Sequence, residues 1–131
     1  MRYAKQTKKN VNSKKIIKLK TKIFNSYLKK NKLKLRTGVK EIIKYSKQQE
    51  IKLALVSSTS KNNINSIFFC LRDSLNKKDF DFIGNSKLVK KLKPSAEIYK
   101  LALKELKLKP KECIAICLLY TSDAADDYRS V

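Results

Sequence analysis

The sequence predicts an α/β fold in which parallel strands alternate with helices. Ile51–Val56 is an unbroken apolar run rich in branched side chains, which is typical of a strand buried on both faces. The segments on either side of this run carry apolar residues at helical spacing. The predicted order along the chain is helix, helix, strand, helix, strand, helix, strand. Because helices connect successive strands, we expect a parallel sheet with right-handed crossovers.

Two amphipathic helices precede the first strand. The first extends over Lys14–Lys30, where apolar residues recur every three or four positions between lysines. The second opens at Thr37-Gly38 and ends near Gln49, with Glu41 in its first turn, where a carboxylate interacts favourably with the helix dipole. The apolar positions are Ile16, Leu19, Ile23, Tyr27 and Leu28 in the first helix, and Val39, Ile42 and Ile43 in the second.

Four further elements follow the first strand. The hydroxyl run Ser57–Ser60 can cap the third helix, which extends to about Leu71. Apolar residues that alternate with acids predict a short strand at Phe80–Ile83. Pro94-Ser95 opens a fourth helix, which Lys109-Pro110 ends. Cys113–Ile116 then predicts the beginning of a third buried strand.

The charge is strongly positive and unevenly placed. The 131 residues include 32 Lys and Arg against 11 Asp and Glu, for a net charge of +21, and residues 1–40 hold 15 of the basic residues and no acid. This surplus predicts either a nucleic-acid surface or a solvated, lysine-rich face. We favour the solvated face, because the cations are nearly all Lys, whereas base reading and bidentate phosphate binding depend on Arg.

Composition also indicates the class of protein and the cellular compartment. The 42% hydrophobic content is ordinary for a folded domain. No apolar run approaches the ~18 residues of a membrane span, and the polar N-terminus lacks the apolar region of a signal peptide. Three cysteines without a CxxC motif or any histidine argue against zinc and for a reduced compartment. We therefore expect no membrane partner and an intracellular protein.

Two groups of residues can carry chemistry at the carboxyl ends of the strands, where ligands bind in open α/β sheets. Ser57-Ser58-Thr59 lies between a strand and a helix, so hydroxyls and backbone N–H groups there can cradle a phosphate. Lys93 lies in a connector, beside Pro94, and can neutralise charge on a phosphoryl group. Taken singly, each pattern is more often structural, since serines cap helices and most lysines are solvated.

Taken together, these segments resemble a known family. LRTGVKEIIKYSKQQEIKLALVSSTSKNNI resembles the segment around the second motif of haloacid dehalogenase-like hydrolases, and KLKPSAEIYKLALKELKLKPKECIAI resembles the segment that carries their third motif. LKTKIFNSYLKKNKLKLRTGV is similar to the return from cap to core in the branch that contains xylulose-bisphosphate phosphatase and beta-phosphoglucomutase. The resemblance covers residues 14–116.

The resemblance implies a fragment of a Rossmann-like parallel sheet core with helices on both faces, plus the last helix of a helical cap. Residues 1–34 would hold the basic segment and the end of the cap, and residues 35–116 part of the core. Residues 117–131 contain CLLYTSDAADD, which resembles a translated sequencing-library adapter, so we expect a non-native tail there.

The resemblance also assigns site residues. Ser57 corresponds to the second-motif hydroxyl that binds the substrate phosphate, although Ser58 can take this role if the register shifts by one. Ser58 otherwise offers its backbone N–H, and Thr59 lines the pocket. Lys93 corresponds to the third-motif lysine, which binds the phosphate and steadies the nucleophilic carboxylate.

Two parts of the family's machinery are missing from the sequence. The nucleophile lies in an Asp-x-Asp motif after an apolar strand, whereas Asp79-Phe80-Asp81 follows Asn76-Lys77-Lys78, and we interpret it as a chance match. The acidic pair that completes the Mg²⁺ site is replaced by Cys117-Leu118. We therefore expect no metal ligands in this chain, and no activity from it alone.

The implied function is that of a Mg²⁺-dependent phosphatase that hydrolyses a small phosphorylated sugar through an aspartyl-phosphate. We expect the full-length parent to be a monomer in the cytoplasm, or in the plastid stroma of a photosynthetic source. Two alternatives stay open. A phosphosugar mutase of the same superfamily would share every site residue named above, and a basic nucleic-acid-binding module would use the lysine surplus.

Overall fold

The protein is an α/β structure built on two parallel strands. The computed structural model describes residues 12–31 and 33–116. Strands β1 and β2 pair in parallel, with Ala54 opposite Phe82 and Val56 opposite Gly84. This confirms the predicted α/β class. In chain order the elements are α2 (Ser13–Lys30), α3 (Val39–Gln48), β1 (Ala54–Val56), α4 (Lys61–Cys70), the 3₁₀ turn η1 (Lys77–Asp79), β2 (Phe82–Gly84), α5 (Glu97–Leu106) and the 3₁₀ turn η2 (Pro110–Glu112).

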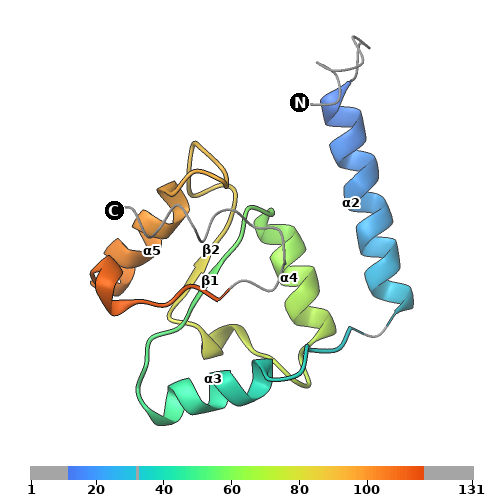
Figure 1. Cartoon of the computed structure of the whole chain (residues 1–131). Coiled ribbons are helices and arrows are strands. Elements are labelled where there is room, and N and C mark those ends of the chain that lie inside the picture. Colours follow the sequence, from blue (N-terminus) through green and yellow to red (C-terminus); the bar gives the residue numbers. More distant parts are fainter. Residues whose placement is uncertain (1–11, 32, 117–131) are drawn as a thin grey trace.

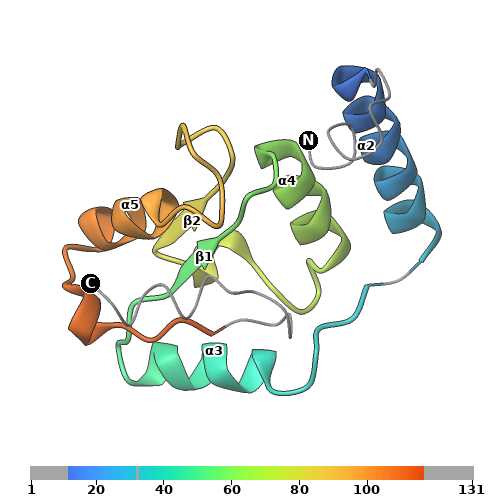
Figure 2. The same ribbon diagram turned by 45° about the horizontal axis from the view of Figure 1, so that its top comes forward.

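The helices flank the strand pair. Figure 1 shows α5 on one side of the strands and α4 on the other, with α2 beyond α4. The view in Figure 2 keeps this order and shows α3 along the end of the molecule from which β1 starts. Helix α5 contacts both strands, and α2 contacts α4. The predicted placement of helices on both sides of the sheet is therefore found in the structure.

The core lies mainly between the strands and the inner faces of α4 and α5. Ile98 is fully buried on α5, against the backbone of Gly84 on β2. Phe68 on α4 meets Phe80 edge to face, with ring centroids 5.9 Å apart, a geometry that aromatic pairs favour. The buried hydrophobic residues of the described chain are Leu28, Ile64, Phe68, Leu71, Ile98, Ala102 and Leu106.

Helix ends follow local chemistry. The Ser60 hydroxyl accepts a hydrogen bond from Asn63 N at 3.3 Å, which confirms that a hydroxyl of the Ser57–Ser60 run caps α4. Helix α3 starts after Gly38, whose φ of 85° places it in the left-handed region. Helix α5 ends at Leu106, before the predicted Lys109-Pro110 break, because Lys107 turns the backbone into the left-handed conformation.

Two strand predictions need correction. Cys113–Ile116 is not a strand: these residues form no helix or strand and are exposed, with Ile114 90% exposed. An apolar run becomes a strand only beside a partner strand, and the described sheet contains only β1 and β2. The first strand is also shorter than Ile51–Val56. The first residues of the predicted run form hydrogen bonds outside the strand pair. Ile51 N donates to Ser46 O, and Leu53 N donates to the Asp81 carboxylate.

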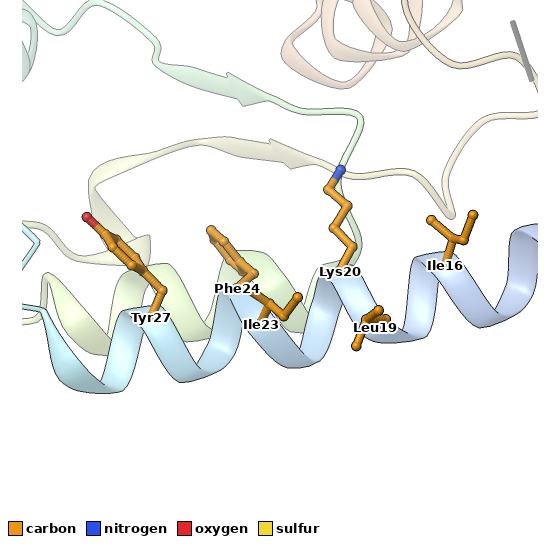
Figure 3. Close-up of a pocket in the computed structure, with 6 residues that line it drawn as sticks. All are labelled: Ile16, Leu19, Lys20, Ile23, Phe24 and Tyr27. Atoms are coloured by element: carbon orange, nitrogen blue, oxygen red, sulfur yellow. The ribbon is translucent and has the colours of Figure 1, made fainter. Parts of the chain in front are cut away.

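Helix α2 presents an apolar stripe to the solvent. An open, shallow groove of about 490 Å³ lies along it, and Figure 3 shows Ile16, Lys20, Phe24 and Tyr27 in a row on the helix. None of the helices in the described ranges is both long and apolar enough to span a membrane. The division at residue 34 between cap and core stays a prediction, and the expected tail, residues 117–131, lies outside the described residues.

Candidate functional site

The loop after β1 is built by its own hydroxyls. Ser57 N donates to Gly84 O at 3.2 Å, so the loop starts from the strand ladder. The Ser57 hydroxyl accepts a hydrogen bond from Thr59 N at 3.2 Å, which closes a serine turn of the kind that short hydroxyl side chains favour. The loop therefore begins at a defined position at the carboxyl end of β1.

The far end of the loop is held by α4 and by the segment after β2. The Thr59 hydroxyl accepts a hydrogen bond from the Asn63 side-chain amide at 3.0 Å, and Thr59 O accepts one from Ser86 N at 2.8 Å. Ser60 then caps α4. Because both ends are bonded to regular structure, residues 57–59 form a short, braced loop at the N-terminus of α4.

Lys93 reaches this loop from the connector between β2 and α5. Its Nζ donates to Val56 O at 3.1 Å, and its backbone N–H donates to the Ser58 hydroxyl at 3.3 Å. Its Nζ also lies 4.7 Å from the centroid of the Tyr99 ring. The structure thus brings Ser57, Ser58 and Lys93 together at one end of β1, although 35 residues separate Ser58 from Lys93.

The chemistry of this site suits an anion. Ser57, Ser58, Thr59 and Lys93 are all half-buried, so a ligand can reach them while part of the bulk water is excluded. An ammonium group has three N–H donors, so Lys93 can keep its bond to Val56 O and still donate to a ligand. The positive end of the α4 dipole lies at the same loop.

Glu97, the first residue of α5, is held by the connector. Its two carboxylate oxygens accept hydrogen bonds from Lys90 N and Lys91 N, each at 2.8 Å. These two backbone bonds hold the pKa of Glu97 below its usual range. The carboxylate thereby ties the start of α5 to the connector that carries Lys93.

The two aspartates of the Asp-x-Asp look-alike lie at the other end of the sheet. Asp79 bonds to Lys47, which is the main reason that its pKa is lowered, and it also accepts a hydrogen bond from Asn76 N. Asp81 accepts a hydrogen bond from Leu53 N at the amino end of β1. Both carboxylates therefore stabilise turns at the end of the sheet opposite the loop of residues 57–59.

The residues described here do not fit a Mg²⁺ site. Among residues 12–31 and 33–116, no three Asp, Glu, His or Cys side chains come close enough together to hold a metal ion. The donors near Lys93 are hydroxyls, amides and an ammonium group, whereas Mg²⁺ is bound through carboxylates and phosphates. No catalytic step through Mg²⁺ can therefore be built from these residues.

Two residues at the site escape sequence reasoning. Asn85 is buried directly after β2, where its side-chain oxygen accepts a hydrogen bond from Lys87 N at 3.1 Å. Its signal in the sequence is a polar residue at the carboxyl end of a predicted strand. Tyr99 lies in the first turn of α5 with its ring beside Lys93. No sequence pattern indicates this contact, since it depends on how α5 is seated.

Comparison with known proteins defines the class to which this fold and site belong. The family model for "haloacid dehalogenase-like hydrolase" matches residues 1–117. The chain therefore belongs to the haloacid dehalogenase-like hydrolase family, as the two motif segments predicted, and its parallel α/β structure is that of a fragment of a Rossmann-like core.

Two curated relatives are similar in sequence to this chain. The chain is 31% identical over 97 residues to Protein CbbY of Cereibacter sphaeroides, a match that covers 74% of this chain and 42% of the relative. It is 27% identical over 99 residues to a CBBY-like protein of Arabidopsis thaliana, covering 76% of this chain and 31% of that protein. The matched region thus spans less than half the length of either relative. No solved structure is significantly similar to the chain.

Proposed function

We propose that this chain is part of a phosphatase that hydrolyses a small phosphorylated sugar, and that Ser57 and Lys93 bind the phosphoryl oxygens. The observation that supports the proposal is the meeting of the two motif segments at one loop. Lys93 bonds to Val56 O and Ser58 there, and the hydroxyl of Ser57 lies in the same turn. Family membership and the likeness to CbbY-type proteins give the hydrolase class.

The residues of this chain would bind and stabilise the phosphoryl group. The Lys93 ammonium and the Ser57 hydroxyl would hold oxygens on which negative charge is concentrated during phosphoryl transfer. By resemblance to the family, an aspartate attacks phosphorus and water hydrolyses the aspartyl-phosphate. We place that aspartate, and the carboxylates that would hold Mg²⁺, outside residues 12–116. Mg²⁺ would neutralise phosphate charge in the full-length parent.

Phosphate release from a panel of sugar phosphates, with Mg²⁺ present, tests the proposal on a chain extended to the full length of its relatives. Lys93→Ala should lower kcat/KM by about 100-fold or more, since it removes a charge that stabilises the transition state. Lys100→Ala, an exposed lysine on α5, is the matched control and should leave the rate unchanged. Activity that survives Lys93→Ala would contradict the proposal.

Serine variants of the extended protein, and the 131-residue chain on its own, complete this test. The larger loss between Ser57→Ala and Ser58→Ala identifies the serine that binds the phosphate. The 131-residue chain alone should release no phosphate. Formation of an isomeric sugar phosphate in place of free phosphate would indicate the mutase alternative. Tight, salt-sensitive binding of DNA that Lys93→Ala does not change would indicate the nucleic-acid alternative.

A further inference from the structure

We propose that Tyr99 is a positioning residue that holds the Lys93 ammonium at the phosphate-binding loop. The inference rests on the proposed function, because it assumes that Lys93 binds the phosphoryl group. It assigns the first turn of α5 a direct part in the site. It also explains how a long, flexible side chain is fixed at one place in the loop.

Two electron-rich groups hold the ammonium. Lys93 Nζ lies 3.1 Å from Val56 O and 4.7 Å from the centroid of the Tyr99 ring. The second distance is within the roughly 6 Å over which a cation is attracted to the face of an aromatic ring. One contact comes from the end of β1 and the other from α5, so the ammonium is fixed between two elements of the core.

The helix turn that carries the ring is anchored in the core. Ile98, the neighbour of Tyr99, is the fully buried side chain of α5 and packs against Gly84 of β2. Glu97, on the other side of Ile98, ties the helix start to the connector through Lys90 N and Lys91 N. The two residues that precede Tyr99 are therefore anchored, and Tyr99 N donates to Ala96 O at 3.0 Å, so the first turn of α5, which carries the ring, is held in place.

An aromatic partner leaves the positive charge of the Lys93 ammonium available to a ligand. A carboxylate would neutralise Lys93 and would compete with an incoming phosphate, whereas a ring and a carbonyl orient the ammonium and leave its full charge for an anion. The carboxylate of Glu97, four residues further along the chain, is engaged by the backbone N–H groups of Lys90 and Lys91. Within the described part of the chain, the ion pair found joins Lys47 to Asp79, at the far end of the sheet.

NMR of the 131-residue chain tests the contact itself. Protons above an aromatic ring are shifted upfield, so the ε-methylene signal of Lys93 should lie upfield of the other lysines. The shift should persist in Tyr99→Phe, which keeps the ring, and disappear in Tyr99→Leu. Tyr45→Leu is the matched control, since Tyr45 is an exposed tyrosine of α3. An ordinary Lys93 shift in the wild-type chain would overturn the inference.

Titration with inorganic phosphate then tests the consequence. The wild-type chain should bind phosphate, and Tyr99→Leu should weaken binding by about threefold to tenfold, the range of one partly desolvated cation–π contact. Tyr99→Phe should remain within about twofold of the wild type by the same reasoning. Lys93→Ala measures the baseline, and the amide spectrum of each variant reports whether it is folded.

The outcomes separate the two proposals. If the wild-type chain and Lys93→Ala bind phosphate equally, or neither binds, Lys93 is not a phosphate ligand and both proposals fail. If Lys93→Ala loses binding but Tyr99→Leu matches the wild type, the positioning role alone is wrong. If Tyr99→Leu unfolds the chain, the wild-type shift and the phosphate affinity of Tyr99→Phe decide, and loss of either contradicts the inference.

Discussion

At the scale of single residues, the two serines of the loop have different partners. The Ser57 hydroxyl accepts from Thr59 N within its own turn, whereas the Ser58 hydroxyl accepts from Lys93 N across the site. A hydroxyl that accepts a hydrogen bond keeps its own proton as a donor. Each serine can therefore donate to a phosphate oxygen, and the hydrogen bond from Lys93 N to the Ser58 hydroxyl additionally couples the loop to the lysine.

Glu97 should make stability depend on pH. Its pKa is lower in the folded chain, chiefly because its carboxylate accepts hydrogen bonds from Lys90 N and Lys91 N. The stabilisation is therefore present above the ordinary glutamate value of about 4.3, and is lost as the pH falls through the lower folded value. We expect the wild type to lose more stability than Glu97→Gln between pH 6 and about pH 3.

Urea unfolding at a series of pH values measures this difference. Glu105→Gln, an exposed glutamate near the end of the same helix, is the control and should follow the wild type. Parallel curves for the wild type and Glu97→Gln would show that the two backbone bonds do not form in solution.

At the scale of secondary-structure elements, the two glycines should respond differently to substitution. A Cβ at Gly84 would lie 3.1 Å from two side-chain carbons of Ile98 and from Phe82 Cε1, so in Gly84→Ala these side chains must shift by a few tenths of an ångström, and Ile98 is fully buried. We expect Gly84→Ala to lower the free energy of unfolding by about 1–3 kcal/mol, as in other overpacked cores. Chemical denaturation gives the value.

Gly38 is the contrasting case. A Cβ there meets nothing within 4 Å, but φ is +85°, which disfavours L-residues. Gly38→Ala should cost about 1–2 kcal/mol through the backbone alone. Gly38→Asn should recover part of this loss, since Asn tolerates the left-handed region. Equal costs for Gly38→Asn and Gly38→Ala would show that backbone strain is not the cause.

Sequence patterns predicted helices better than strands in this chain. The helices at Ser13–Lys30, Val39–Gln48 and Lys61–Cys70 lie close to their predicted bounds, because helical periodicity and caps are local features. Cys113–Ile116 has the composition of a strand but none of its hydrogen bonding. A strand depends on a partner strand, which is often distant in sequence, and composition carries no information about that partner.

The same reasoning applies to the site. The expected closeness of Ser57 and Lys93 follows from their positions at the carboxyl ends of parallel strands, which topology alone imposes. The contact between Lys93 and Tyr99 depends instead on the seating of α5 against Gly84, which is a matter of packing. The phosphate-binding roles of these residues stay predictions until the variants are measured.

At the scale of the whole molecule, the core is small. Seven hydrophobic side chains are buried among the described residues, and several large ones, including Ile23 and Phe69, are more than half exposed. We expect the free energy of unfolding of the 131-residue chain to lie below the ~5–15 kcal/mol of ordinary domains. Urea unfolding followed by circular dichroism measures it, and a sharp transition worth more than about 5 kcal/mol would contradict this expectation.

The two-stranded sheet has a consequence for the behaviour of many molecules together. In the described structure each strand pairs on one side only, and an unpaired strand edge is a template for a strand from another copy. The charge of +21 opposes such encounters by mutual repulsion between copies. Added salt screens that repulsion and leaves the edges unchanged. Colloidal stability of this protein therefore depends on ionic strength, with dilute buffers keeping the copies apart.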